Sequence, residues 1–226
     1  MSVKMQIKKW VENDSWVTRG ILALLNYAPF NNHFSLKGNK LHCSNALLRK
    51  SNISVYGKNN NITISKGCRL YKLKISVTGD GNSIVLGKNV VGNQLEIWVE
   101  DNNNTVTIGD DTKLAGKVHL ACTESTQLSI GLRCLFSSEI VIRTGDSHLI
   151  MGEDGERLNA AKPVLIGNHV WIGHRVLITK GVKIMDESVV GTGSIVTKEF
   201  NESNVIIAGV PAQVIKRKVK WDISRG

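Results

Sequence analysis

Histidine changes its charge near neutral pH, so the six histidines of the chain are the first candidates for proton-transfer chemistry. His148 stands out because it follows Asp146 in the segment GDSHLI, where the regular pattern of the surrounding residues stops. A neutral imidazole can accept the proton of a hydroxyl that attacks an acyl group, and its other nitrogen then needs an acceptor that orients the ring. Asp146, a backbone carbonyl or a carboxylate of the loop could be that acceptor, and the sequence does not choose among them. The competing interpretation is a histidine that only faces water at a turn.

A metal site is the other chemistry that histidines offer. His169 and His174 lie five residues apart on either side of Trp171, in the segment PVLIGNHVWIG. A zinc site needs at least a third protein ligand, and only His148 could supply it, from beyond a long polar segment. We therefore expect no metal. The four cysteines contain no CxxC pair and are expected to be reduced and mostly buried.

The residues around these histidines follow a six-residue period, which neither an α-helix nor a two-residue β alternation produces. Every sixth position is aliphatic, and the next residue is mostly glycine or threonine: the anchors are Ile166, Ile172, Ile178, Ile184, Val190 and Val196. Three short flat segments joined by sharp turns would place one anchor on each wall of a triangular coil, with glycine suited to the corners.

Upstream, from about residue 36 to 144, the period lengthens to 22 residues. Its aliphatic anchors are Ile64, Leu86, Ile108 and Ile130. The four extra residues in each coil are rich in Asn, Asp and Gly, which suit a protruding turn. A repeat of this length predicts a solenoid.

Three blocks carry a family resemblance: GDSHLI before a loop at 149–163, PVLIGNHVWIG after it, and VVGTGSIVTK followed by IAGVPA near the end. With them the chain resembles the hexapeptide-repeat acyltransferases of the left-handed parallel β-helix type. It is most similar to the branch with galactoside, chloramphenicol, and capsule or O-antigen sugar O-acetyltransferases. The resemblance covers about residues 50–226 and is strongest at 140–217. It implies an all-β solenoid, and only the resemblance implies the left hand, because right-handed connections are the rule for parallel strands.

The resemblance also implies site residues. His148 would be the general base, with Asp146 beside it and Trp171 against the acyl or acceptor pocket. In this family acetyl-CoA lies in a groove between neighbouring subunits of a homotrimer, and the N–H of a corner glycine such as Gly173 would stabilise the oxyanion. The residues implied to line the coenzyme groove are Trp171, Gly173, His174 and Thr192 around the acyl group and the pantetheine arm, Thr197 and Lys198 nearer the nucleotide, Ala208 and Gly209 against adenine, and Lys216 and Arg217 at the phosphates. Gln213 departs from the family pattern, which has a basic residue at that position.

The two ends of the chain differ from the repeat. We expect residues 1–35 to form a helical arm or cap, 36–210 the β-helix with its loop at 149–163, and 211–226 a basic tail. The arm has a helical spacing of apolar residues, with Asp14 or Ser15 as its N-cap and Pro29 as its stop. Such a helix would cover the open end of a solenoid. With its lysines and two tryptophans, it could instead lie on a membrane surface.

Composition narrows the class of partner. The net charge of +10 favours an anionic ligand, such as an acidic carbohydrate acceptor in addition to the coenzyme. The basic residues are not interleaved with aromatic residues and no recognisable motif is present, so no nucleic acid is expected. With no signal peptide and no apolar run near 20 residues, the expected location is the cytoplasm, without a membrane span. Peripheral association with a membrane remains open.

The function expected from these features is the acetyl-CoA-dependent O-acetylation of a sugar hydroxyl in a surface polysaccharide, capsule or O-antigen, or in its precursor. One alternative is an aminosugar N-acetyltransferase on the same fold, because an amine acceptor must also lose a proton. An alternative of another class is a non-catalytic, glycan-binding β-solenoid. The DSHLI loop and the VTK…AGVPA ending argue against the last alternative, because a passive solenoid needs neither.

Overall fold

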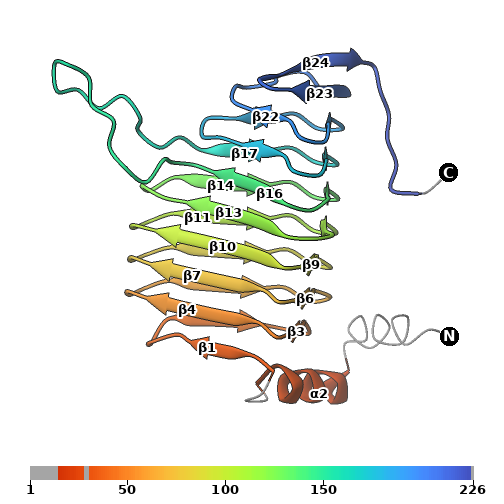
Figure 1. Cartoon of the computed structure of the whole chain (residues 1–226). Helices are drawn as coiled ribbons and strands as arrows, with labels where there is room; N and C mark the ends of the chain where they lie inside the picture. Colours follow the sequence, from red (N-terminus) through yellow and green to blue (C-terminus); the bar gives the residue numbers. More distant parts are fainter. Residues whose placement is uncertain (1–14, 28–30, 225–226) are drawn as a thin grey trace.

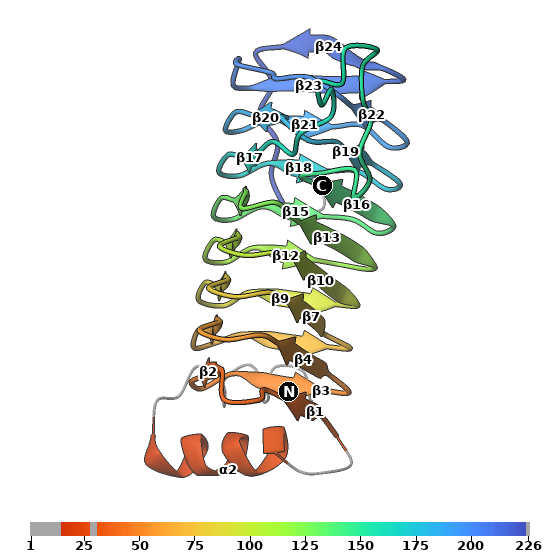
Figure 2. The ribbon, with the colours of Figure 1, turned by 90° about the vertical axis from the view of Figure 1, so that its left-hand side faces the viewer.

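The structure, a computed structural model, describes residues 15–27 and 31–224. These residues form a parallel β-solenoid of stacked, three-walled coils, and among them one short helix lies at the N-terminal end (Figures 1 and 2). The expected fold, a left-handed parallel β-helix, is confirmed. Asp14 and Pro29, the predicted cap and stop of the arm, lie outside the described residues, as do the lysines of the arm.

Each wall of the solenoid is one sheet, and the chain passes from wall to wall in the order A, B, C. Sheet A has eight strands: β1 (His33–Ser35), β4 (Asn52–Tyr56), β7 (Lys74–Thr78), β10 (Leu95–Glu100), β13 (Val118–Cys122), β16 (Ile140–Arg143), β19 (Leu177–Ile178) and β22 (Ile195–Val196). Sheet B has seven: β2 (Lys40–Cys43), β5 (Asn61–Ile64), β8 (Ser83–Leu86), β11 (Thr105–Ile108), β14 (Gln127–Ile130), β17 (Val164–Ile166) and β20 (Lys183–Ile184). Sheet C has nine: β3 (Leu47–Arg49), β6 (Arg69–Tyr71), β9 (Val91–Asn93), β12 (Lys113–Leu114), β15 (Leu135–Phe136), β18 (Trp171–Ile172), β21 (Val189–Val190), β23 (Val205–Gly209) and β24 (Ala212–Arg217).

The six-residue period places one anchor on each wall in turn. Ile166 and Ile184 lie in sheet B, Ile172 and Val190 in sheet C, and Ile178 and Val196 in sheet A. All six side chains are buried. Because the sheets are parallel and in register, each anchor lies directly above the one in the coil below, and aliphatic ladders fill the interior. Burying one such side chain is worth about 1.5–3 kcal/mol relative to leaving it exposed.

The 22-residue period is the same pattern with a longer corner. Its anchors pair in register along sheet B, from Ile64 through Leu86 and Ile108 to Ile130, and the ladder continues into Ile166. The extra residues form the turns between sheets A and B, as the Asn-rich composition predicted.

A second ladder, of buried asparagines, stabilises these turns. The side-chain oxygen of Asn60 accepts the backbone N–H of Asn82 at 2.8 Å, and that of Asn82 accepts the backbone N–H of Asn104 at 2.8 Å. The Asn82 amide nitrogen donates to the carbonyl oxygen of Asp101 at 2.9 Å. Each turn therefore satisfies the polar groups of its neighbour although the solenoid buries them.

Helix α2 (Trp16–Tyr27) covers the open N-terminal end of the solenoid. Ser15 is its N-cap, as one of the two predictions had it, because the Ser15 hydroxyl oxygen accepts the Thr18 N–H at 3.2 Å. One face of the helix is buried: Thr18, Leu22 and Asn26. The Asn26 side chain donates to the carbonyl oxygen of Ala46 at 2.7 Å and accepts the N–H of Leu48 at 2.9 Å, in the first coil.

The opposite face of α2 is apolar and exposed, with Trp16 and Leu24 facing outward. The exposed apolar face of α2 is thus compatible with contact to a membrane surface, while the opposite face caps the solenoid. Within the described part of the chain, we find no helix that is long and apolar enough to cross a membrane.

The C-terminal end is closed by an antiparallel hairpin of β23 and β24. After β24 the chain runs back along the outside of the solenoid (Figure 1). There the Trp221 ring stacks on the His169 ring with 4.1 Å between the ring centroids, and its Nε1 donates to the His169 carbonyl oxygen at 2.9 Å. The basic tail therefore packs on sheet C.

We predict that Asn82→Ala lowers the free energy of unfolding by about 1–3 kcal/mol, because it leaves the buried Asn104 N–H without its acceptor. The urea midpoint of unfolding measures the change. Lys58→Ala, in an exposed position of a neighbouring turn, is the matched control and should change the midpoint little. Equal midpoints for the two variants would show that the asparagine ladder does not stabilise the turns.

Candidate functional site

The regular coils are interrupted once, between β16 and β17, at a corner between sheets A and B. The chain leaves the solenoid after Thr144 and forms a long excursion before it returns (Figure 1). The Lys162 N–H donates to the Thr144 carbonyl oxygen at 2.8 Å, which closes the base of the loop. The buried Thr144 hydroxyl accepts the Thr123 N–H at 3.0 Å and so holds the departing chain to the coil below. His148 is therefore on a loop whose base is rigid.

Three side chains hold the loop segment that carries His148. The Asp146 carboxylate pairs with the Lys180 ammonium and accepts a hydrogen bond from the Asn159 amide at 3.1 Å. The same Asn159 amide nitrogen donates to the backbone oxygen of His148 at 2.7 Å, and the Asn159 side-chain oxygen accepts the Ile150 N–H at 2.8 Å. Lys180 also donates to the Asn159 carbonyl oxygen at 2.8 Å. We call Asp146, Asn159 and Lys180 the loop anchor.

The loop anchor is stabilised by the opposite charges of Asp146 and Lys180. The hydrogen bond from Lys180, more than any other contact, lowers the pKa of Asp146 below its ordinary value. A lowered carboxyl pKa means that the contact stabilises the fold above the ordinary pKa of an aspartate and is lost as the pH falls through the lowered value. The anchor is thus fully formed at neutral pH.

Asp146 was expected to be one of the groups that could orient the His148 ring. The structure uses its carboxylate for Lys180 and Asn159 instead. Among residues 15–27 and 31–224, no side chain or backbone group forms a hydrogen bond with the His148 ring. In this structure Asp146 is linked to His148 through the Asn159 amide and the loop backbone rather than through the ring.

The His148 side chain is exposed and borders a hollow of about 510 Å³ on the outer surface of sheet A. Trp98, His119 and Arg143, from three adjacent strands, line this hollow together with Glu100, Ala121 and Ser147. A hollow of this size, open to water and next to an exposed imidazole, can hold a small polar ligand such as one sugar unit.

A second group of predicted residues lies at a different corner, between sheets C and A. Gly173 and His174 follow β18, Thr192 follows β21 in the next coil, and Ala208 and Gly209 end β23 above them. The Gly193 N–H donates to the His174 carbonyl oxygen at 2.8 Å, and the Gly209 N–H donates to the Ser194 hydroxyl at 3.2 Å, so these corners form one continuous column. We call this set the corner column.

His174 in the corner column has a defined tautomer. Its Nδ1 lies 3.0 Å from the backbone oxygen of Ser138 and 2.9 Å from the Ser138 hydroxyl. Because a carbonyl oxygen only accepts, Nδ1 carries the proton, and Nε2 of the neutral ring is left as an acceptor.

Gly173 does not have the free N–H that the oxyanion hypothesis requires. Its N–H donates to the Val190 carbonyl oxygen at 2.8 Å within the coil-to-coil hydrogen bonding. The hypothesis that this group stabilises the oxyanion is therefore wrong. Gly173 is small for a steric reason: a Cβ there would lie 2.7 Å from the Thr192 backbone nitrogen.

Trp171 lies on sheet C, away from the His148 hollow of the same chain. Its ring lies 5.9 Å from that of Trp221, so the C-terminal tail is its neighbour. His169, next to it, pairs its Nδ1 with Glu187 at 2.6 Å. The described part of the chain contains no cluster of three His, Cys, Asp or Glu side chains that could hold a metal.

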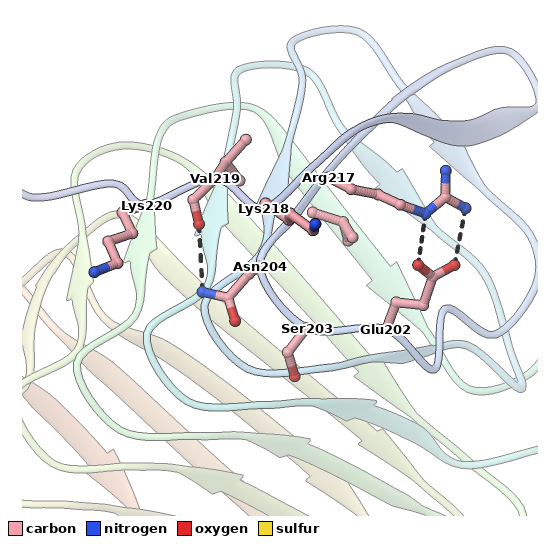
Figure 3. A pocket seen from close by; sticks show the side chains of 8 residues that line it. Glu202, Ser203, Asn204, Arg217, Lys218, Val219 and Lys220 are labelled. Carbon is pink, nitrogen blue, oxygen red and sulfur yellow. Dashed lines mark hydrogen bonds and ion pairs between the residues drawn. The ribbon is translucent and has the colours of Figure 1, made fainter.

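The cationic residues predicted for the phosphates have different surroundings. Arg217 is paired with Glu202 through two hydrogen bonds of 2.7 and 3.0 Å, at the edge of a cavity of about 490 Å³ (Figure 3). Lys198, with Thr197 at a corner between sheets A and B, donates to Gln213 at 2.7 Å. Lys216 is exposed on β24, and within the described residues its ammonium has no paired carboxylate.

The candidate site residues of one chain thus form two groups that lie apart from each other. His148 and the loop anchor lie at the corner between sheets A and B, whereas the corner column lies at the other edge of sheet A. The sequence predicted His148 and most residues of the corner column as site residues, and these remain predictions, but it did not single out Lys180, Asn159 or Ser138. None of these three belongs to a recognisable motif, and their roles depend on how the loop and the coils meet in space.

The chain is similar to known proteins in sequence and in fold. Residues 163–198 match the signature "Bacterial transferase hexapeptide (six repeats)". The galactoside O-acetyltransferase of Escherichia coli K12 is 40% identical over 100 residues, which cover 43% of this chain and 48% of that protein. The polysialic acid O-acetyltransferase of Neisseria meningitidis is 36% identical over 107 residues, which cover 47% of this chain and 50% of that protein.

A solved structure extends the likeness. The polySia-specific acetyltransferase NeuO superposes with a TM-score of 0.76 at 29% identity, and the match covers 86% of this chain and 88% of that one. The sequence matches to the two curated relatives, in contrast, span about half of their length.

We predict that Lys180→Met releases the loop from the solenoid and lowers kcat by about tenfold or more for any reaction in which His148 takes part, because a misplaced side chain loses its near-attack geometry. The melting temperature should change by only a few degrees, since Lys180 does not belong to the aliphatic ladders. Lys183→Met, on the neighbouring strand β20, is the control and should leave kcat unchanged. A Lys180→Met protein with the wild-type kcat would rule out the loop anchor as a positioning device.

Proposed function

We propose that the chain is a member of the hexapeptide-repeat transferases and an acetyl-CoA-dependent O-acetyltransferase. The match of residues 163–198 to the hexapeptide signature and the likeness to O-acetyltransferases in sequence and fold support this proposal. The acceptor would be a sugar hydroxyl of a surface polysaccharide, capsule or O-antigen, or of a precursor. The observation that carries this proposal is that a charged anchor holds the loop backbone at His148, whose exposed side chain lies at the rim of a sugar-sized hollow. The activity and the substrate of the whole protein are part of the proposal.

In the proposed reaction His148 acts as the general base. A sugar hydroxyl is a weak nucleophile, and the neutral imidazole removes its proton as the oxygen attacks the thioester carbonyl. The tetrahedral intermediate then loses the thiolate, to which the imidazolium returns the proton. The products are the acetylated sugar and free coenzyme A, and no acyl-enzyme forms. We assign the stabilisation of the oxyanion to no glycine, since the N–H of Gly173 is already used.

The small residues of the corner column support the placement of a pantetheine arm and an adenine ring there. Gly191, Gly193 and Gly209 leave its surface almost free of side chains, and Thr192 is exposed upon it. A Cβ at Gly191 would lie 2.9 Å from that of Ala208, so the coils meet closely here. We place acetyl-CoA along this column and propose that the exposed Lys216 binds its phosphates. Lys198 and Thr197 lie at the next corner, where we expect the nucleotide.

This arrangement supports the homotrimer that the family resemblance implies. His148 and the corner column of one chain lie at opposite edges of sheet A, and the base must reach the thioester. If a neighbouring subunit presents its own column, with Trp171, to the His148 hollow, both halves of the site meet at the interface. The family resemblance supports such inter-subunit sites.

An acidic acceptor is supported by the distribution of charge. Residues 31–79 contain nine Lys and Arg and no Asp or Glu, so the first coils attract a polyanion. The relatives named above include a polysialic acid O-acetyltransferase, whose acceptor is acidic. The four cysteines are free thiols, three of them buried, which fits a reducing compartment such as the cytoplasm.

We predict that His148→Ala lowers kcat for acetyl transfer by about 10²–10⁴-fold, because the hydroxyl then has no positioned base. Release of free coenzyme A thiol in the presence of an acceptor measures the rate. His42→Ala, in an exposed position of β2, is the control and should keep full activity. Transfer near the wild-type rate in the His148 variant would refute the base assignment.

The same assay separates the proposal from its rivals. Matched hydroxyl and amino sugars distinguish O-acetylation from N-acetylation, and a preference for the amine would favour the N-acetyltransferase. A glycan-binding solenoid would release no thiol with either acceptor and would not bind coenzyme A.

A further inference from the structure

The hollow beside His148 is built from three adjacent strands of sheet A. Trp98 of β10, Ala121 of β13 and Arg143 of β16 are consecutive partners in register. Neighbouring strands lie about 4.8 Å apart, so roughly 10 Å separate the backbones that carry the tryptophan and the arginine. Ala121, between them, contributes only a methyl group to the floor. The row therefore has an aromatic wall, a low floor and a cationic wall.

Trp98 forms the aromatic wall, and it is exposed although the equivalent positions of the preceding strands carry small polar residues. The Trp98 residue has a relative solvent exposure of 37%. The residues aligned with it in the two preceding strands of sheet A are small and polar, Ser54 and Ser76. The Lys74 ammonium lies 5.8 Å from the Trp98 ring centroid and pairs with Glu96 at 2.6 Å. Glu96 also pairs with His119 Nδ1 at 3.1 Å. This network fixes the groups around Trp98 and leaves the remaining ring surface toward the hollow.

The opposite wall offers hydrogen-bond donors. One terminal nitrogen of Arg143 donates to the Ser147 hydroxyl at 3.1 Å, within the loop segment that precedes His148. A guanidinium has five N–H donors, so most of those of Arg143 remain for a ligand. Glu100 is the acidic side chain of the lining, and it can accept hydrogen bonds from hydroxyl groups.

We propose that this hollow is the acceptor subsite and that it selects a sugar with a carboxylate. The C–H face of the pyranose ring would lie on the Trp98 ring, whose face carries partial negative charge. The carboxylate would bind Arg143 through the bidentate geometry that guanidinium favours. A hydroxyl at the far side of the ring would then reach His148. This inference rests on the proposed function, and it adds Trp98 and Arg143 as the residues that determine acceptor specificity.

The lining also argues against a phosphate-rich ligand in this subsite. Glu100 would repel the phosphates of a nucleic acid or a nucleotide, whereas the hydroxyls of a sugar can donate to it. The presence of one cation and one anion in the same hollow suits a ligand that carries a single charge and several hydroxyl groups.

The test compares two variants on two acceptors, a short oligosialic acid and the same oligomer with its carboxylates reduced to alcohols. Trp98→Ala should raise the acceptor KM roughly tenfold or more for both oligomers, because both stack on the ring. Arg143→Gln should raise it by a similar factor for the acidic oligomer only, because only that oligomer pairs with the guanidinium. Trp98→Phe should restore most of the affinity. The KM for acetyl-CoA should not change in any of them.

Matched controls on other parts of the solenoid are Tyr56→Ala, an exposed aromatic of β4, and Arg133→Gln, an exposed arginine in the turn between β14 and β15. Neither should change either KM. Wild-type acceptor KM values in Trp98→Ala and Arg143→Gln, with an active wild-type enzyme, would overturn the subsite. So would a Trp98→Ala protein whose mass in solution differs from that of the wild type, because Trp98 would then be a subunit contact. A wild-type protein that acetylates no hydroxyl of any sugar would instead contradict the proposed function itself.

Discussion

The constraint on which the structure depends is the hydrogen bonding of each coil to the next. The backbone of a short strand in this fold has no partner within its own coil, so every wall must pair in register with the coils above and below it. Register then forces equivalent side chains into vertical ladders. The aliphatic ladder through Ile64, Leu86 and Ile108 and the asparagine ladder through Asn60, Asn82 and Asn104 are two results of the same requirement.

This constraint also decides where a functional loop can lie. A departure within a wall would break the pairing of that strand with the strands above and below it in the same sheet, whereas a departure at a corner leaves the walls intact. The excursion after Thr144 follows that rule, and the hydrogen bond between Lys162 and Thr144 restores the coil immediately. The corner that holds His148 is consequently separated from the corner column by the whole width of sheet A. Rigid coils cannot bend to bring the two corners together, which is the physical reason for proposing a second subunit at the site.

Much of the fold could be predicted from the sequence because its determinants are periodic. The anchors from Ile166 to Val196 show the walls directly, and Ser15 marks the start of α2 through a local capping rule. The sequence also pointed to the position of His148, since this residue lies where the six-residue period stops. These features depend on residues that are close together in the chain.

The parts that could not be predicted depend on contacts between distant residues. Lys180 meets Asp146 only because the next coil places its corner under the loop, and Arg217 meets Glu202 only because β24 folds back on β23. Asp146 was a candidate partner of the His148 ring until the structure showed where its charge is used. The N–H of Gly173 appeared available in the sequence, but the coil-to-coil pairing consumes it.

The most direct test of a site shared between subunits is activity in mixed oligomers of two inactive variants. His148→Ala removes the base, and Thr192→Trp, at an exposed position, fills the corner column of the other half. If the two halves come from different subunits, co-expression of the two variants should restore acetyl transfer to about a quarter of the wild-type level, as random assembly of equal amounts requires. If the mixture stays as inactive as its components, the base and the acyl carrier are bound by one chain, and a site shared between subunits is ruled out.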